Sequence, residues 1–346
     1  MKPLQSEDLE HILKHTLPLW EQMRGRNIFI AGGTGFFGIW LLESLTRCNR
    51  SLNLDLSITV LSRTPEAFAR EVPHLASNNH IRTLKGDVRN FTFPDGNFDY
   101  VIHAAAPTTG DAAGGARDLL DILVTGTDRM LEFARARGAE RFLFVSSGAV
   151  YGSQPAYLSH ISEDTLGGPA WLETSGVYGE GKRVAEQMCA IAARECGFGV
   201  TIARCFSFVG PHLPLDAHFA IGNFIGDALA GRDILLRSDG TSVRSYLYAA
   251  DLAIWLWTLL LRGGASGTIP SVFNVGSDQA ISIGDLARCV IRELNPSGKI
   301  HAAIDPLVGS ERSRYVPDVG RAKEILGLHQ TIDLDEAIRR TAAWYR

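Results

Sequence analysis

The stretch that decides the fold is NIFIAGGTGFFG, residues 27–38. A short apolar run fills its first five positions and is typical of a buried strand. Glycines follow at Gly32, Gly35 and Gly38, and Phe37 to Cys48 then has a helical pattern. In such a turn one glycine makes the bend, one lets the backbone approach a pyrophosphate, and one lets the helix pack on the strand. Because free N–H groups and the helix dipole stabilise phosphate charge, the stretch predicts a bound dinucleotide.

Strand and helix patterns alternate through the first two hundred residues. The further strands that we expect are 57–61, 81–84, 100–103, 141–146 and 200–203, and the long helices that we expect are 116–137 and 177–196. This alternation predicts an α/β fold with a doubly wound parallel sheet of Rossmann type.

The regions on either side of this alternation have other patterns. Residues 5–24 read as an amphipathic helix that packs against the body or a partner subunit. After Arg204, loops with glycine and proline separate helical pieces at 219–230, 250–262, 282–294 and 319–326. We therefore predict an N-terminal helical extension at 1–25, a dinucleotide-binding domain at 26–205, and a smaller, mainly substrate-binding lobe at 206–346. The last of these can also contribute strands to the sheet.

Composition excludes several classes of protein. Hydrophobic residues make up 45% and charged residues 21%, as in a globular chain. The net charge is -4 without a basic run, which argues against nucleic acid as the main partner. The five cysteines include no C-x-x-C pair, so we expect neither a disulfide framework nor a metal site. The most apolar stretch, 252–261, is shorter than the roughly 20 residues that span a bilayer. Residues 1–26 have no apolar core of signal-peptide type. We expect a cytoplasmic protein with no membrane partner.

The turn and the ends of the next two strands supply the predicted cofactor site. The turn residues that we assign to it are Gly32, Thr34, Gly35, Phe36, Phe37 and Gly38. An acid at the end of the second strand would bind the ribose 2′-OH of NAD, but Ser62 and Arg63 stand there. A guanidinium suits a phosphate dianion, which favours NADP(H) and leaves NAD(H) open, with Arg63 stacking on adenine. Asp87, next to Val88, either accepts a hydrogen bond from the adenine amino group or only stabilises a turn.

A second motif, Tyr178-x-x-x-Lys182, follows. Together with the glycine turn it resembles the short-chain dehydrogenase/reductase superfamily, and more narrowly its extended branch, which acts on nucleotide sugars. The strings that support the resemblance are HAAA at 103–106, SSGAVYG at 146–152, FVGP at 208–211, VRSYLY at 243–248 and PD at 317–318. The resemblance covers about residues 26 to 330, and it implies that Ala104, Ala105 and Ala106 line the cofactor.

The chemistry of the second motif can be argued from its residues. Tyrosine has a pKa of about 10, and a lysine one helical turn away would favour the tyrosinate. Tyr178 could then exchange a proton with a sugar hydroxyl or carbonyl while hydride moves to or from the nicotinamide. Ser147, at the end of a neighbouring strand, would hydrogen-bond the same oxygen. The resemblance implies that Lys182 also holds the nicotinamide ribose. The alternative interpretation is a surface pair on a helix.

The resemblance also implies substrate contacts. It assigns Arg244 to the nucleotide diphosphate, a second such arginine to Arg314 or Arg312, and Asn223 to a place near the phosphates. Thr108 and Ser147 complete the predicted substrate site. Each of these could instead be an ordinary surface group. The same resemblance implies a homodimer that pairs through the two long helices.

Several positions depart from the pattern of that branch. Dehydratases and decarboxylases usually carry an acid just after the catalytic Ser or Thr, where this chain has Gly148 and Ala149. Leu123 and Ser207 stand where Asn is frequent. We therefore favour a keto-sugar reductase or a 4-epimerase, and Ser62–Arg63 tilts the choice towards the reductase. The alternatives left open are a 4,6-dehydratase or decarboxylase, a reductase of a small carbonyl compound, and a non-catalytic dinucleotide sensor.

Overall fold

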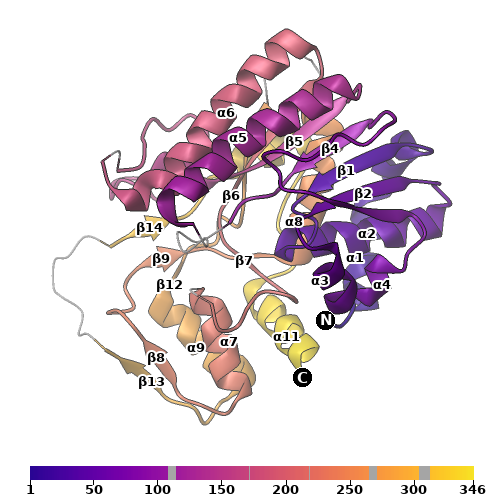
Figure 1. Ribbon diagram of the computed structural model, residues 1–346. Coiled ribbons are helices and arrows are strands. Elements are labelled where there is room, and N and C mark those ends of the chain that lie inside the picture. Colours follow the sequence, from indigo (N-terminus) through magenta and orange to yellow (C-terminus); the bar gives the residue numbers. More distant parts are fainter. Residues whose placement is uncertain (108–113, 171, 218, 265–270, 304–311) are drawn as a thin grey trace. The chain divides into compact units, whose positions relative to one another are not determined.

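The computed structural model describes the chain except for residues 108–113, 171, 218, 265–270 and 304–311 (Figure 1). It divides into two compact units, each built from separate segments. The first unit comprises Met1–Gly152, Leu166–Cys205 and Ala253–Phe273. The second comprises Ser153–Thr165, Phe206–Leu252 and Asn274–Arg346. The division therefore differs from the contiguous domains that the sequence suggested.

A seven-stranded sheet organises the first unit, which confirms the predicted α/β fold. Its strands are β1 (Asn27–Ala31), β2 (Ser57–Ser62), β3 (Ile81–Lys85), β4 (Tyr100–His103), β5 (Arg141–Ser147), β6 (Gly199–Cys205) and β11 (Ser271–Val275). Their order is β11-β6-β5-β4-β1-β2-β3, and β1 to β6 run parallel. Because β1 lies between β2 and β4, the strand order reverses there, and ligands of such sheets bind at the carboxyl ends of the strands at that point.

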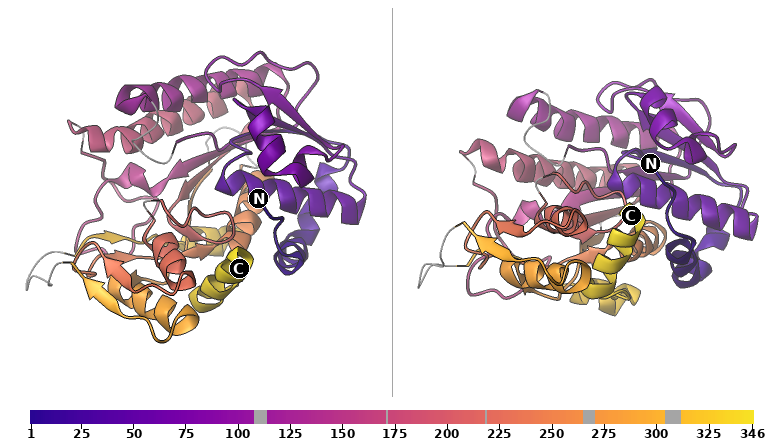
Figure 2. Two further views of the ribbon diagram at one scale, coloured as in Figure 1. Left: turned by 60° about the horizontal axis from the view of Figure 1, so that its bottom comes forward. Right: turned by 90° about the horizontal axis from the view of Figure 1, so that it is seen from below.

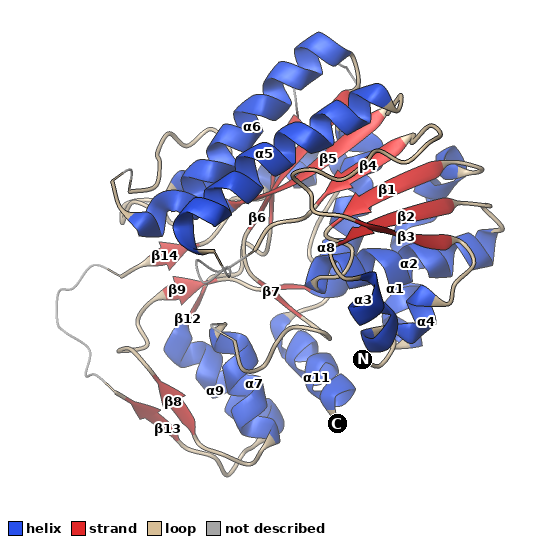
Figure 3. Cartoon of the chain, in the orientation of Figure 1, coloured by secondary structure: helices blue, strands red, loops and turns tan. Residues whose placement is uncertain are grey.

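Helices cover both faces of this sheet (Figure 3). The helical segments of the first unit are α1 (Ser6–Thr16), η1 (Leu17–Met23), α2 (Phe36–Leu52), α3 (Pro65–Glu71), α4 (Pro73–Ala76), α5 (Gly115–Ala136), η2 (Gly148–Tyr151), η3 (Thr174–Gly176), α6 (Val177–Cys196), most of α8 (Ala249–Thr258) and the π-turn η4 (Leu259–Gly263). Right-handed crossovers on opposite sides of β1 put α2 on one face and the neighbouring pair α5 and α6 on the other (Figure 2).

An aromatic cluster fixes the central strand from which the glycine turn starts. The ring of Phe29 in β1 lies 4.3 Å from that of Phe133, 5.5 Å from that of Phe91 and 5.6 Å from that of Phe98. All four side chains are buried. Aromatic pairs of this kind contribute about 0.5–1.5 kcal/mol each beyond the burial of their area. The glycine turn is thus built on a tightly packed base.

The N-terminal extension packs on the first unit, as its apolar pattern suggested. The segment predicted as one helix is an α-helix followed by a 3-10 helix, because Pro18 has no N–H with which to continue the α-helical pattern. Trp20 is fully buried, with its ring 5.3 Å from that of Trp257 in α8. The Trp257 Nε1 donates a hydrogen bond to the hydroxyl of Ser44 in α2 at 2.9 Å. The extension therefore packs on α8, which is itself hydrogen-bonded to α2.

In its described residues the second unit contains three small sheets and four further helices. The sheets are β10 (Leu247–Tyr248) with β7 (Phe208–Val209), β12 (Ile281–Ser282) with β9 (Val243–Arg244) and β14 (Arg314–Tyr315), and β13 (Ile300–Ala302) with β8 (Ile234–Leu236). The helices are α7 (Ala220–Leu229), α9 (Ile283–Leu294), α10 (Gly320–Leu326) and α11 (Leu334–Tyr345). The last of these was not predicted.

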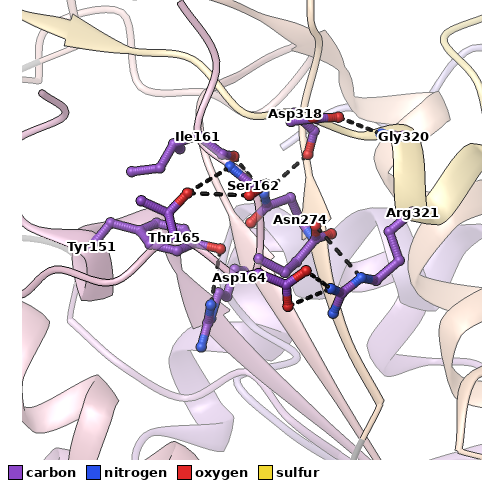
Figure 4. Close-up of polar contacts among 11 residues, drawn as sticks. Tyr151, Ile161, Ser162, Asp164, Thr165, Asn274, Asp318, Gly320 and Arg321 are labelled. Carbon is purple, nitrogen blue, oxygen red and sulfur yellow. Dashed lines mark hydrogen bonds and ion pairs between the residues drawn. The ribbon is translucent and has the colours of Figure 1, made fainter. Parts of the chain in front are cut away.

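A polar cluster explains why residues 153–165 belong to the second unit (Figure 4). The side-chain amide of Asn274 donates to the carbonyl oxygens of Ile161 at 2.8 Å and Asp318 at 3.0 Å. Arg321 Nη2 lies 2.7 Å from both carboxylate oxygens of Asp164. Three segments that are distant in sequence are therefore joined by these contacts.

Within the described residues, no helix has both the length and the apolar character that a membrane crossing needs. Nor do the described side chains include a group of three or more His, Cys, Asp or Glu residues placed to hold a metal ion.

Candidate active site

The three glycines of the turn have different structural roles. Gly32 has a φ of 90°, and a Cβ there would lie 2.5 Å from the backbone of Ala104. A Cβ on Gly38 would lie 2.3 Å from the carbonyl oxygen of Gly32. Gly35 has an ordinary φ of -88°, and a Cβ on it would have only the Gly32 oxygen nearby, at 3.7 Å. The fold itself requires Gly32 and Gly38, whereas Gly35 leaves open space beside the turn.

This open space fits a dinucleotide pyrophosphate. Thr34 and Gly35 are exposed, and Phe36 and Phe37 are half-buried in the first turn of α2. The 17-residue helix presents N–H groups there that have no carbonyl partner within the helix. The predicted turn residues therefore lie together at a helix N-terminus suited to an anion.

The end of β4 lies beside the turn. Ala104 N donates to the Ala31 carbonyl at 2.8 Å, and Ala105 packs against the core. His103 is buried, with Nε2 3.1 Å from the Thr127 hydroxyl, and burial lowers the pKa of His103 to about 3. His103 is therefore neutral at physiological pH. The structure places Ala104 and Ala105 next to the glycine turn, and Thr108 lies outside the described residues.

Ser62, Arg63 and Asp87, which bear on the choice between NAD and NADP, lie in described parts of the structure. Ser62 is buried and its hydroxyl accepts a hydrogen bond from Thr64 N at 3.2 Å, while Arg63 is exposed. Each carboxylate oxygen of Asp87 accepts from the Arg89 guanidinium at 2.9 Å, which lowers the pKa of Asp87. Asp87 thus already orders its loop, and an adenine amino group would share an oxygen with Arg89. The neighbouring Val88 is buried.

The structure brings Ser147, Tyr178 and Lys182 together. Ser147 lies near enough to the Tyr178 hydroxyl to lower its pKa, and the Ser147 oxygen accepts a hydrogen bond from Ala149 N at 3.2 Å. Lys182 Nζ donates to the Val145 carbonyl at 2.7 Å and lies 5.9 Å from the centre of the Tyr178 ring. The end of β5 and two successive turns of α6 therefore meet at one polar site.

Burial shifts the proton affinities of this site. It raises the pKa of Tyr178 to about 12, against the hydrogen bond from Ser147, which lowers it. Burial also lowers the pKa of Lys182 to about 8. In the protein without ligand, Tyr178 is therefore protonated at neutral pH, and additional positive charge is needed to favour its tyrosinate.

A buried polar network that was not predicted from the sequence lies behind these residues. Ser146 donates to Glu186 at 2.6 Å, Glu186 pairs with Arg204 at 2.7 Å, and Arg204 donates to the Tyr151 hydroxyl at 2.9 Å. A signal for Glu186 was present, because it continues the four-residue spacing of Tyr178 and Lys182 on α6. The partner Arg204 had no such signal, since it comes from another strand.

Of the predicted substrate residues, Ser147 lies in the first unit, whereas Arg244, Asn223, Arg312 and Arg314 belong to the second. Arg244 lies in β9 and donates to its own strand at Val243 O, 2.8 Å away, and to Ser313 O at 3.3 Å. The register pairs Arg314 with Val243 and Tyr315 with Arg244. Paired residues on neighbouring strands share a face, so Tyr315, and not Arg314, lies on the face of Arg244. Arg312 lies near Asp239, whose pKa its charge helps to lower after the hydrogen bonds from Thr241. Asn223 is half-buried in α7.

The fold and the glycine turn define the class of protein: an α/β enzyme of the dinucleotide-dependent short-chain dehydrogenase/reductase type. The comparison with protein families sharpens this class. Residues 28–276 match the model described as "NAD dependent epimerase/dehydratase family", so the chain belongs to that family. The resemblance drawn from the sequence is confirmed.

Curated relatives and solved structures are similar over most of the chain. UDP-glucuronic acid decarboxylase 1 of Xenopus tropicalis is 27% identical over 322 residues, covering 93% of this chain and 72% of the relative. UDP-glucuronic acid decarboxylase 3 of Arabidopsis thaliana is 28% identical, covering 90% and 86%. The structure of MoeE5 with UDP-glucuronic acid and NAD has a TM-score of 0.73 at 25% identity, covering 92% and 99%. UDP-glucuronic acid 4-epimerase from Bacillus cereus, at 20% identity, a TM-score of 0.75 and coverage of 92% and 98%, shares the fold.

Proposed function

We propose that this chain oxidises or reduces a sugar carbon of a nucleotide sugar, as a keto-sugar reductase or a 4-epimerase, through Ser147, Tyr178 and Lys182. The observation that carries the proposal is the place of Tyr178 beside Ser147, which lowers the pKa of its hydroxyl, and beside the buried ammonium of Lys182. A protein that only senses a dinucleotide has no need of this arrangement.

Each of the three residues has a defined task in this proposal. Tyr178 exchanges a proton with the sugar oxygen at its hydroxyl, and Ser147 hydrogen-bonds the same oxygen. Lys182 supplies positive charge that lowers the cost of the tyrosinate. The glycine turn and Ala104 hold the cofactor, and the nicotinamide, when bound, accepts or supplies hydride.

A second candidate reaction, decarboxylation, is favoured by the relatives. Curated relatives are UDP-glucuronic acid decarboxylases, although Gly148 and Ala149 provide no carboxylate after Ser147. Oxidation at C4 of a uronic acid creates a β-keto acid, which can lose CO2 without an added acid or base from the protein. The proton-transfer site that we propose would therefore also serve the first step of this reaction.

The cofactor has two competing indications. The family is NAD-dependent, and the solved structure of MoeE5 is a complex with NAD. The exposed Arg63 and the lack of an acid at Ser62 favour NADP(H). Fluorescence titration with NADH and NADPH decides between them. If Arg63 binds a 2′-phosphate, Arg63→Ala weakens NADPH binding alone; equal weakening of both cofactors would instead indicate stacking on adenine.

The substrate residues and the oligomer remain part of the proposal. We assign Arg244, Asn223 and Arg314 to a nucleotide diphosphate; Arg314 lies on the face of the small sheet opposite that of Arg244.

We also propose a homodimer through α5 and α6, on which Leu120, Val184 and Ile191 are more than 40% exposed. Sedimentation of Val184→Glu tests the dimer, which should dissociate if this face is the interface.

Product analysis tests the proposed reaction. The purified protein is incubated with each cofactor and with UDP-glucose, UDP-galactose, UDP-glucuronic acid and a UDP-4-keto sugar, and the products are identified by NMR. An inverted C4 identifies an epimerase, consumption of NAD(P)H with the keto sugar identifies a reductase, and release of CO2 from UDP-glucuronic acid identifies a decarboxylase. If every substrate is returned unchanged, the proposed function is wrong.

A further inference from the structure

Helix α6 presents a stripe of three polar side chains to the end of β5. Tyr178, Lys182 and Glu186 are spaced four residues apart, so they lie on one face of the helix on successive turns. Tyr178 contacts Ser147, Lys182 contacts the carbonyl of Val145, and Glu186 accepts from the Ser146 hydroxyl at 2.6 Å. Three successive turns of α6 thus contact three consecutive residues of β5, namely Val145, Ser146 and Ser147.

The third contact is reinforced by a buried ion pair. Both carboxylate oxygens of Glu186 accept from Arg204, at 3.0 Å from Nε to Oε1 and 2.7 Å from Nη2 to Oε2. The two side chains are only 10% and 16% exposed. Arg204 stands beside Ser146 in the register of β5 and β6, so the pair ties α6 to both strands.

The same arginine reaches the segment that follows Ser147. Arg204 Nη1 donates to the Tyr151 hydroxyl at 2.9 Å, and its guanidinium carbon lies 4.8 Å from the centre of that ring. Tyr151 ends η2, the turn that begins directly after Ser147 and whose Ala149 N–H binds the Ser147 oxygen. The pair is thus connected to the position of Ser147 from both sides.

Stability alone is a poor reason for such a pair. Removing two charges from water costs about as much as their attraction returns, and replacing a buried pair with apolar side chains is often neutral or stabilising. The Glu186–Arg204 pair connects α6 with the strand β5, and these two elements carry Tyr178, Lys182 and Ser147. The pair can therefore fix the positions of these residues relative to one another.

We propose that Glu186 and Arg204 are positioning residues, which hold Tyr178 and Lys182 in register with Ser147. The carboxylate of Glu186, one helical turn from Lys182, also stabilises the Lys182 ammonium. The role in turnover rests on the proposed function. The effect on Lys182 does not, because it is a property of the protein without substrate or cofactor.

The titratable groups around Lys182 lie on α6, β6 and β4, and β5 adds the Val145 carbonyl and the Phe144 ring. On α6 they are Tyr178, Glu186 and Cys189; β6 contributes Cys205, and β4 contributes His103. Burial is the main cause of the lowered Lys182 pKa, and negative charge on Cys205, then on Glu186 and Cys189, would oppose it. His103 is neutral, and burial raises the pKa of both cysteine thiols, so Glu186 is the anion among these groups at neutral pH.

The first experiment titrates Lys182 in the protein without ligands. The chain has six lysines, so a carbon-13 NMR titration of labelled lysine side chains is simple to assign with Lys182→Met. We expect the wild-type midpoint near 8, a midpoint lower by roughly one pH unit in Glu186→Gln, and a midpoint close to wild type in Glu186→Asp, which keeps the charge. An unchanged midpoint in folded Glu186→Gln overturns the electrostatic half of the proposal.

The second experiment separates positioning from stability. Glu186→Gln leaves the buried Arg204 without its ion-pair partner and should lower thermal stability. We therefore compare it with the double variant Glu186→Gln/Arg204→Met, which removes both charges and should recover much of that stability. We expect kcat to stay roughly 10–100-fold below wild type in the double variant, with KM little changed. If kcat recovers together with the melting temperature, the pair is only structural and the proposal fails.

Asp99→Asn is the matched control. It breaks another ion pair of the first unit, between Arg26 and Asp99 at 2.6 Å, next to the amino-terminal ends of β1 and β4. It should lower stability while leaving the Lys182 midpoint and kcat unchanged, and an equal loss of kcat would overturn the assignment. If the wild-type protein turns over no substrate, the proposed function fails, and the Lys182 titration still decides whether Glu186 maintains the charge.

Discussion

Burial changes the proton affinity of the Lys182 side chain. Its ammonium is almost completely enclosed and has the Val145 carbonyl as a hydrogen-bond partner. The enclosure lowers the pKa of Lys182 from 10.5 to about 8. The same enclosure raises the pKa of Tyr178 to about 12. Each shift favours the neutral form, so a ligand that brings charge to this site changes the proton affinity of both residues.

The lowered pKa of Lys182 makes stability depend on pH in a defined direction. Between pH 8 and 10.5 the unfolded chain binds the proton more tightly than the folded chain, so the free energy of unfolding rises with pH across this window. The cost of the buried charge is complete below pH 8 and disappears above 10.5. The free energy of unfolding of Lys182→Met, relative to that of wild type, should therefore be about 2–3 kcal/mol higher at pH 7 than at pH 10.

Urea unfolding at the two pH values measures this difference. Lys85→Met is the control, since Lys85 is 70% exposed and should show no such dependence. A difference between wild type and Lys182→Met that is the same at both pH values would contradict the lowered pKa.

At the scale of elements, the glycine turn combines a folding requirement with a binding surface. Gly38 lies so close to the Gly32 carbonyl that a side chain there must displace backbone, whereas Gly35 has free space. The spacing of the glycines, together with the flanking strand and helix, was enough to predict this element from sequence. The spacing could not show which glycine serves packing, because that depends on the backbone positions of Gly32 and Ala104.

Alanine at the two glycine positions should separate these roles. Gly38→Ala should lower the melting temperature of the protein without ligand, because its Cβ would lie 2.3 Å from the Gly32 oxygen. Gly35→Ala should leave that temperature nearly unchanged and weaken cofactor binding, because the added methyl group occupies the space in front of α2. Differential scanning fluorimetry with and without NAD(H) measures both effects. A Gly35→Ala variant that binds the cofactor as wild type does would show that the pyrophosphate lies elsewhere.

At the scale of the whole chain, long periodic segments could be predicted and short non-local ones could not. The runs at 27–31 and 100–103 match β1 and β4 in full, because strands of a parallel sheet are buried on both faces and read as apolar runs. The two-residue strands β9, β12 and β14 have no periodicity, and their pairing joins residues up to about seventy positions apart. The Glu186–Arg204 pair was missed because Arg204 comes from β6, and no sequence pattern links that position to α6.

The N-terminal extension should contribute to the stability of the whole chain. Trp20 is fully enclosed against Trp257, and a Trp→Ala change in such a site typically costs about 3–5 kcal/mol. We therefore expect Trp20→Ala to lower the midpoint of urea unfolding sharply, while Leu17→Ala, at a position that is 53% exposed, has little effect. Equal small effects would mean that the extension does not pack on the body in solution.

The central claim is that Tyr178 transfers the proton in a hydride-transfer reaction on a nucleotide sugar. The most direct test is to measure kcat and the cofactor dissociation constant of Tyr178→Phe beside wild type, with the substrate that product analysis identifies. We predict that kcat falls by roughly 10²–10⁴-fold, since general acid–base catalysis contributes about this much, while cofactor affinity hardly changes. A Tyr178→Phe enzyme with wild-type kcat would contradict the account.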